Sequence, residues 1–153
     1  MTIEYRKAGL GDIAAMQKLV APEVESGVIL MRTDNEIATN IRSYWLAFDG
    51  ETLVGFSALH IHTHVLSEVR SLIVHTDYRR GDIGTVLVEK CVEEAQALGL
   101  KEVLVLTYQQ QFFERLGFSE ISKESLPEHK IWADCIKCKH FPICNEVSLI
   151  KAI

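Results

Sequence analysis

The segment from Glu68 to Leu98 constrains the fold and the chemistry of this chain more than any other. It reads EVRSLIVHTDYRRGDIGTVLVEKCVEEAQAL, which is typical of a β-strand, a tight turn rich in arginine and glycine, and a long amphipathic helix. The start of such a helix presents free backbone N–H groups and the positive end of the helix dipole. The segment therefore predicts a binding site for a pyrophosphate, and with it a nucleotide-like cofactor.

The turn carries residues that suit an anionic ligand. Gly81 and Gly84 let the backbone come close to a ligand, and Arg79 and Arg80 add charge-assisted hydrogen-bond donors. The helix that follows is expected to run from Ile83 to Leu98, with Gly99 just after its end. Its expected apolar stripe consists of Ile83, Leu87, Cys91 and Leu98.

Composition and charge narrow the class of protein. Hydrophobic residues make up 48% of the 153 residues and charged residues 24%, so we expect one globular domain over residues 1–153. The net charge of -5 speaks against a nucleic-acid partner. No apolar run approaches the roughly 20 residues of a membrane span, and the N-terminus MTIEYRKAG lacks a signal-peptide core. We therefore expect a cytoplasmic protein without a membrane partner.

The remaining periodicity predicts an α+β fold (a mixed α/β sheet) in which helices surround a mostly antiparallel sheet. Asp12 is the expected N-cap of a first helix, because apolar positions at helical spacing follow it. A second helix is expected from about Asp34 to Arg42. Strands are expected at Ile3 to Lys7, Tyr44 to Phe48, Thr52 to Ile61, Ser67 to Val74 and Val103 to Thr107, after Gly117-Phe118, and at the closing VSLIKAI; a short helix is expected at Phe112 to Leu116.

The order of these motifs resembles the GCN5-related N-acetyltransferases, the GNAT family. The resemblance rests on the YRRGDIG turn between a strand and a helix, the VLVLT strand, and FFERLGF, and it covers nearly the whole chain. It implies a twisted, mostly antiparallel central sheet flanked by helices, and acetyl-CoA as co-substrate. Within the family, SEVRSLIVHTDYRRGDIG, LTYQQQFFERLGF and the tail LPEHKIWADCIKCKHFPICNE are similar to the short, stand-alone N-acetylglutamate synthases.

The resemblance also implies which residues bind the cofactor. Two positions depart from the family pattern: Asp82 stands where the first glycine of the turn is expected, and Phe113 where many members have a tyrosine that protonates the thiolate of CoA. Tyr108 lies nearby in the sequence at a different register. The residues implied for acetyl-CoA binding are Leu72, Ile73 and Val74 on a splayed strand, Arg79, Arg80, Gly81, Asp82, Ile83, Gly84 and Thr85 at the turn, and Phe112.

Acetyl transfer to an amine also needs a group that accepts the proton of the amine. Glu68 is the expected base, and His62 and His64 are alternatives. Arg70 and Arg32 are the expected clamps for a substrate carboxylate, because a planar guanidinium binds carboxylates through two hydrogen bonds. Strand alternation places Glu68, Arg70 and Leu72 on one face, and Val69, Ser71 and Ile73 on the other. The alternatives are a structural ion pair between Glu68 and Arg70 and a surface cation at Arg32.

The expected function is transfer of acetyl from acetyl-CoA to the α-amino group of L-glutamate, the first step of arginine biosynthesis. The expected partners are these small molecules, with a homodimer left open. An acetyltransferase for a polyamine or a protein N-terminus is the second reading. A catalytically weak acetyl-CoA-binding regulatory module is the third.

The C-terminal region carries a cysteine motif, because Cys135, Cys138 and Cys144 form C-x2-C-x5-C. The C-x2-C spacing is one that zinc sites use. Only one such pair is present, so reduced structural or pocket thiols are favoured over a bound metal, and a redox-sensing disulfide is a third alternative. The alternatives for a fourth metal ligand are His140, His129 and Asp134.

Overall fold

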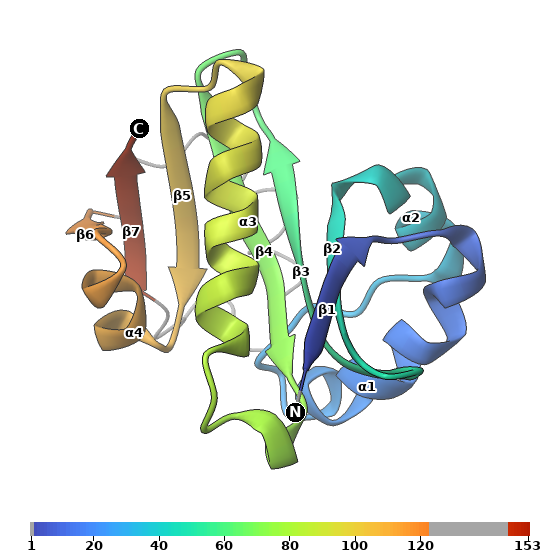
Figure 1. The fold of residues 1–153 in the computed structure, drawn as a ribbon. Coiled ribbons are helices and arrows are strands. Elements are labelled where there is room, and N and C mark those ends of the chain that lie inside the picture. Colours follow the sequence, from blue (N-terminus) through green and yellow to red (C-terminus); the bar gives the residue numbers. More distant parts are fainter. Residues whose placement is uncertain (1, 123–146) are drawn as a thin grey trace.

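The computed structural model describes residues 2–122 and 147–153, which form one seven-stranded sheet (Figure 1). The strand order is β1-β2-β3-β4-β5-β7-β6, and the only parallel pair among these neighbours is β4 with β5. The mostly antiparallel sheet predicted from the sequence is confirmed. The strands are β1 (Ile3–Lys7), β2 (Tyr44–Asp49), β3 (Thr52–Ile61), β4 (Leu66–Val74), β5 (Glu102–Thr107), β6 (Ser119–Ile121) and β7 (Val147–Ala152).

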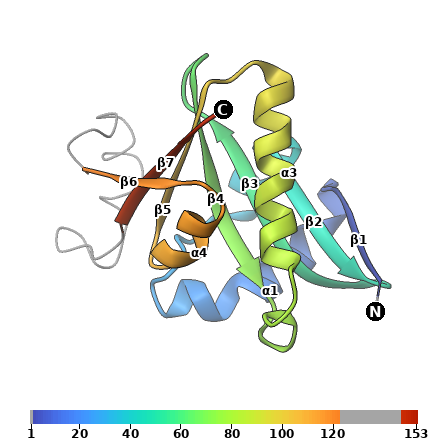
Figure 2. The same cartoon turned by 60° about the vertical axis from the view of Figure 1, so that its left-hand side comes forward.

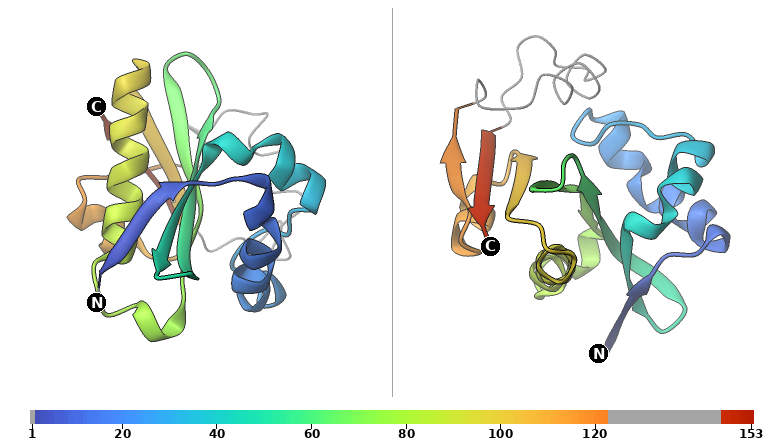
Figure 3. Two further views of the ribbon diagram at one scale, coloured as in Figure 1. Left: turned by 45° about the vertical axis from the view of Figure 1, so that its right-hand side comes forward. Right: turned by 90° about the horizontal axis from the view of Figure 1, so that it is seen from above.

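Helices cover the two faces of the sheet. The helix α3 (Ile83–Leu98) lies across one face, whereas α1 (Ile13–Glu25) and α2 (Asp34–Thr39) pack on the other, as Figures 2 and 3 show from two further sides. A short helix, α4 (Gln110–Arg115), joins β5 to β6. Among the described residues, no helix combines the length and the apolar character that crossing a bilayer requires.

The helix α3 has the bounds predicted from the sequence, but its buried face differs. Gly99 takes the left-handed conformation, with φ at 89°, and its N–H bonds the carbonyls of Ala95 and Gln96. Leu98 was expected on the apolar stripe and is instead 58% exposed, because the last turn extends past the buried surface. The buried residues of α3 are Ile83, Leu87, Val88, Cys91 and Ala95.

Both N-terminal helices begin at the residues that the sequence predicted. The side chain of Asp12 does not cap α1, however, and α2 ends earlier than expected. Asp12 occupies the N-cap position of α1, yet its carboxylate bonds the Gly9 N–H at 2.8 Å and the Arg6 guanidinium at 3.0 Å instead of capping. A capping box between Thr33 and Glu36 begins α2. The expected end at Arg42 is wrong, because a 3-10 turn at Ile41–Ser43 follows α2.

A bulge in β4 changes which side chains share a face. Ala58 pairs with Arg70 and Phe56 pairs with Ile73, so β4 has one more residue than β3 between these two pairs. Ser71 lies within the bulge with φ at 55°, in the left-handed region. Beyond it the alternation predicted from the sequence is wrong: Leu72 packs on the face of α3 and Ile73 on the face of α1.

The strands β4 and β5 pair only over their first residues. The parallel register joins Leu66 to Glu102, Ser67 to Val103 and Glu68 to Leu104, although β4 continues to Val74 and β5 to Thr107. The later part of β4 therefore has no partner strand on its β5 side within the described residues. The bulge at Ser71 lies in this unpaired part.

Candidate functional site

A hollow lies over the middle of the sheet, on the face that α1 and α2 cover. Tyr44, Ala58 and Arg70 are direct cross-strand neighbours on β2, β3 and β4, so they form one row on this face. Ala58 is the small member of the row, which leaves room between Tyr44 and Arg70. The cavity has a volume of about 100 Å³ and is lined by Arg32, Glu36, Asn40, Ser43, Tyr44, Ala58, His60, Arg70 and Ser71.

The two arginines that the sequence singled out line the same hollow. Arg32 comes from the loop between α1 and α2, where its backbone carbonyl accepts a hydrogen bond from Gln17 Nε2 at 2.8 Å. Arg70 comes from β4, and its Nε lies 3.1 Å from Glu68 Oε1. A smaller hollow beneath α1 shares Arg32, Tyr44 and Ser71 with the first. Residues 38 positions apart in the sequence are thus brought together at one site.

Tyr44 is influenced by the charges of both arginines. Its ring is 6% exposed and packs edge-to-face on Phe56, with 5.9 Å between the ring centroids. Burial raises the pKa of the Tyr44 phenol, while the charges of Arg32 and Arg70 act in the opposite direction. The phenol is therefore protonated at neutral pH and lies within the electrostatic reach of both guanidinium groups. Sequence reasoning missed Tyr44, because its pairing with Ala58 is visible only in the register of the sheet.

Glu68 lies beside the hollow but does not line it in the part of the chain that the structure describes. Its side chain is 3% exposed, and Oε1 lies 2.8 Å from His62 Nε2 and 3.1 Å from Arg70 Nε. The ion pair between Glu68 and Arg70, expected as one alternative, is present. His64 is exposed on the hairpin after β3. His60, which sequence reasoning missed, lines the hollow, and its ring centroid lies 4.7 Å from that of His62.

The predicted pyrophosphate turn stands directly before α3. Asp82 occupies the N-cap position with φ at -100°, a conformation that any residue adopts, so the backbone does not require glycine there. Its side chain is exposed, as is that of Arg80. Arg79 is engaged elsewhere: Nε donates to the Val74 carbonyl at 2.8 Å and Nη2 lies 2.7 Å from Glu23 Oε1. Arg79 thus ties the turn to β4 and α1, and Arg80 is an exposed cation beside it.

Apolar residues border the start of α3. A Cβ on Gly84 would lie 3.5 Å from Phe112 Cζ and 3.7 Å from Val74 Cγ2, which places these three predicted cofactor residues together. Phe113 is 2% exposed and packs edge-to-face on Phe118 at 5.4 Å. Phe113 is therefore a core residue, in line with its lack of a donor. Thr107 Oγ1 accepts a hydrogen bond from the Gln109 N–H at 2.8 Å.

Cys91 lies on the buried face of α3, and its thiol is unreactive at neutral pH. It is fully buried beside Ser57, with 3.3 Å between the sulfur and Oγ, and burial raises the pKa of its thiol to about 12. The thiol stays protonated at neutral pH and cannot carry an acyl group as a thiolate. Cys135, Cys138 and Cys144 lie outside the described residues. Within residues 2–122 and 147–153, no group of three or more His, Cys, Asp or Glu side chains could hold a metal ion.

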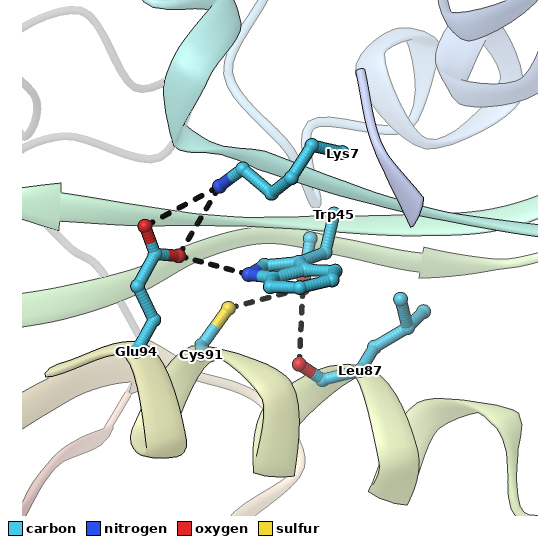
Figure 4. A network of polar contacts seen from close by, with 6 residues as sticks. Lys7, Trp45, Leu87, Cys91 and Glu94 are labelled. Atoms are coloured by element: carbon cyan, nitrogen blue, oxygen red, sulfur yellow. Dashed lines mark hydrogen bonds and ion pairs between the residues drawn. The ribbon is translucent and has the colours of Figure 1, made fainter. Parts of the chain in front are cut away.

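A polar network at the other end of α3 holds this helix on the sheet (Figure 4). Trp45 Nε1 donates to Glu94 Oε1 at 2.8 Å, and Lys7 Nζ lies 3.2 Å from the same oxygen. Lys7 Nζ also lies 4.9 Å from the centroid of the Trp45 ring. Glu94 of α3 is thereby joined to both β1 and β2. The network lies on the opposite face from the hollow, so its role is structural.

Comparison with known sequences identifies the family. A family model described as an acetyltransferase (GNAT) domain matches residues 40–120. An uncharacterised N-acetyltransferase of Chlorobaculum tepidum is 35% identical over 148 residues, which cover 97% of this chain and 95% of that protein. The amino-acid acetyltransferase of Escherichia coli is 27% identical over 129 residues, or 83% of this chain and 29% of that protein. The chain thus spans less than a third of the amino-acid acetyltransferases that it matches.

Solved structures share the fold. An N-acetylglutamate synthase from Neisseria gonorrhoeae, complexed with coenzyme A and N-acetyl-glutamate, matches with a TM-score of 0.89 at 22% identity, over 99% of this chain and 35% of that one. A Mycobacterium tuberculosis protein in complex with CoA matches with a TM-score of 0.83 at 22% identity, over 98% of this chain and 99% of that one. These matches confirm the fold that the sequence predicted.

Proposed function

We propose a function from one premise: the chain belongs to the GNAT family of acetyltransferases. The proposed reaction is transfer of the acetyl group of acetyl-CoA to the α-amino group of L-glutamate, as in an N-acetylglutamate synthase of arginine biosynthesis. The observation that carries the choice of acceptor is the hollow lined by both Arg32 and Arg70. Two guanidinium groups suit a dicarboxylate, because each binds a carboxylate through paired, charge-assisted hydrogen bonds.

Named relatives and one structural neighbour support glutamate as the acceptor. Relatives at 27% identity are named amino-acid acetyltransferases, and a neighbour with the same fold is an N-acetylglutamate synthase complexed with N-acetyl-glutamate. The proposal treats residues 1–153 as one acetyltransferase domain.

Acetyl-CoA fits the residues on the other side of β4. The start of α3 offers backbone N–H groups to a pyrophosphate, and the exposed Arg80 adds a positive charge beside it. Val74 and Phe112 form an apolar border next to Gly84. The unpaired part of β4, from Leu72 to Val74, is where we place the pantetheine arm and the thioester, with backbone N–H groups near the carbonyl oxygen.

The proposed mechanism is direct attack in a ternary complex. The amine nitrogen attacks the thioester carbonyl carbon, a C–N bond forms, and collapse of the tetrahedral intermediate breaks the C–S bond. Glu68, held by His62 and Arg70, is the proposed final acceptor of the amine proton. Because Glu68 is not among the described residues that line the hollow, the proton reaches it through an intervening group or water. The buried, protonated Cys91 takes no part.

Arg32→Ala tests the acceptor. We expect the KM for L-glutamate to rise about 10- to 100-fold, since a charge-assisted pair to the substrate is lost, with kcat nearly unchanged. Arg42→Ala is the matched control, because Arg42 is exposed and lies outside the lining of the hollow. Steady-state release of CoA measures both variants. A glutamate KM for Arg32→Ala within twofold of that for Arg42→Ala would sink the assignment of Arg32 as a carboxylate clamp.

The burial of Phe113 supports a second candidate function. Phe113 is buried in the core, so the position that carries a tyrosine in many family members has no proton to donate. A regulatory module that binds acetyl-CoA with little turnover would tolerate this loss. Such a module would bind acetyl-CoA tightly in a calorimetric titration and release no CoA with any amine.

A further inference from the structure

We propose that His60 is the general base of the acetyl transfer, the group that takes the proton from the acceptor amine inside the hollow. The inference rests on the proposed acetyltransferase function and adds a catalytic residue to it. His60 is the next-to-last residue of β3, and its side chain lines the hollow together with Arg70 and Ala58.

Elimination among the lining residues leads to His60. Of the described residues that line the hollow, His60 and Glu36 are the ones whose side chains can act as proton acceptors. Glu36 is engaged at the start of α2, where its Oε1 lies 3.0 Å from the Thr33 N–H. Tyr44 is protonated, because burial raises the pKa of its phenol. His60 is thus the lining residue best suited to accept a proton.

The groups behind His60 fit a proton path. His60 pairs directly with Glu68 across β3 and β4, and its ring stands edge-to-face to the ring of His62 at 4.7 Å. His62 Nε2 in turn lies 2.8 Å from Glu68 Oε1. A carboxylate and a second imidazole therefore lie next to His60. In this account the proton that His60 takes up passes through His62 to Glu68, whose side chains are 2% and 3% exposed.

Charged groups from each neighbouring element bear on His60. Among the described residues, these are Glu68 and Arg70 from β4, His62 from β3, Glu36 from α2, Arg32 from the loop before α2, and Tyr44 from β2. Glu68 contributes a negative charge near His60, and the two arginines contribute positive charges. The arrangement combines a site that binds negative charge with a base that can accept one proton.

The proton balance of the reaction assigns one step to His60. An acceptor amino acid enters as the ammonium form, and His60 takes one proton, becoming imidazolium and leaving a free lone pair on nitrogen. That lone pair attacks the carbonyl carbon, the C–N bond forms, and the C–S bond breaks as CoA leaves. The second proton of the new ammonium centre passes to the thiolate and gives the thiol of CoA. His60 then passes its proton toward Glu68, and loss of that proton to solvent returns both groups to their starting states.

His60→Gln tests the proposal, with His64→Gln as the matched control on the same hairpin. We expect His60→Gln to lower kcat about 100-fold or more, with the acceptor KM changed less than about threefold, because general-base catalysis contributes that much. The acid limb of the kcat/KM profile should also disappear, because the glutamine amide does not titrate. Calorimetric affinity for CoA, unchanged in His60→Gln, reports that the variant is folded.

The outcomes separate this inference from the proposed function. All variants are assayed with the amine that the wild-type protein acetylates fastest in a panel of amino acids and polyamines. If that amine is not glutamate, the proposed acceptor fails while the role of His60 is still measured. If kcat and the acid limb of His60→Gln match those of His64→Gln, the inference is overturned and the function stands. If the wild-type protein acetylates no amine, both fail together.

Discussion

Ala58 stands between Tyr44 and Arg70 in a row across three strands, and its methyl group leaves room above the sheet. Ser71 contributes from the bulge of β4, where φ of 55° is unusual for a residue with a side chain. The bulge turns Ser71 toward the same hollow that Arg70 lines. Two small residues thus make the space, and the larger polar residues around it give the space its chemistry.

At the same scale, Tyr44→Phe removes one hydroxyl group and keeps the buried ring. We expect the KM for glutamate to rise about tenfold or more, since a hydrogen bond to a charged group contributes about 1.5–3 kcal/mol. The kcat value and the KM for acetyl-CoA should stay the same. Tyr5→Phe is the control, because Tyr5 lies on β1 and packs on the face of α3. Equal glutamate KM values for the two variants would show that Tyr44 does not contact the acceptor.

The sequence predicted some of these residues and missed others for a physical reason. Arg32 and Arg70 were predicted separately, because an arginine is informative wherever it stands. Tyr44, Ala58 and His60 were missed, because their importance depends on which residues pair across β2, β3 and β4. A bulge of one residue also reverses the alternation on which such reasoning relies.

At the scale of elements, the sequence predicted the boundaries well. The observed bounds agree with the predicted ones for α3 (Ile83–Leu98), β1 (Ile3–Lys7) and β3 (Thr52–Ile61). Turn-forming glycines at Gly50 and Gly99 and regular spacing of apolar residues mark where these elements begin or end. Burial at the ends of elements was less predictable, as the exposed Leu98 shows. The end of a helix can lie beyond the surface that its periodic face covers.

The packing of α3 on β3 depends on Gly55. A Cβ there would lie 3.0 Å from the Ile73 carbonyl oxygen, 3.2 Å from Leu87 Cδ1 and 3.4 Å from Ile83 Cγ2. We expect Gly55→Ala to destabilise the protein by about 1–3 kcal/mol, because overpacking moves backbone as well as side chains. Gly11→Ala is the control, since a Cβ there meets nothing within 4 Å. Urea unfolding measures both, and a midpoint for Gly55→Ala equal to that of Gly11→Ala would contradict the packing account.

At the scale of the whole molecule, the sheet separates the proposed acceptor site from most of the proposed cofactor site. The face of α1 and α2 carries the hollow that we propose for the acceptor, and the start of α3 carries the turn that we propose for the cofactor. The two proposed sites meet where β4 leaves β5, because Ser71 lines the hollow while Val74 lies beside Gly84 at the start of α3. The network of Glu94, Trp45 and Lys7 fixes α3 against β1 and β2 at its other end.

This layout predicts a bisubstrate enzyme whose selectivity resides on one face and whose cofactor binding resides at one turn. Substitutions in the hollow should change the KM of the acceptor, and substitutions at the turn should change the KM of acetyl-CoA. The split follows from the distance between the groups along β4 and from the different elements that supply them. Arg32 and Tyr44 belong to the first set and Arg80 to the second, whereas substitution of His60 should lower kcat.

The central claim is that the acceptor is an acidic amino acid, and one measurement tests it most directly. The kcat/KM for CoA release is compared among L-glutamate, L-glutamine and spermidine at a saturating concentration of acetyl-CoA. The account predicts that glutamate exceeds glutamine and spermidine by about tenfold or more, since both competitors lack the second carboxylate that Arg32 and Arg70 would bind. A kcat/KM for spermidine or glutamine equal to or above that for glutamate would contradict it.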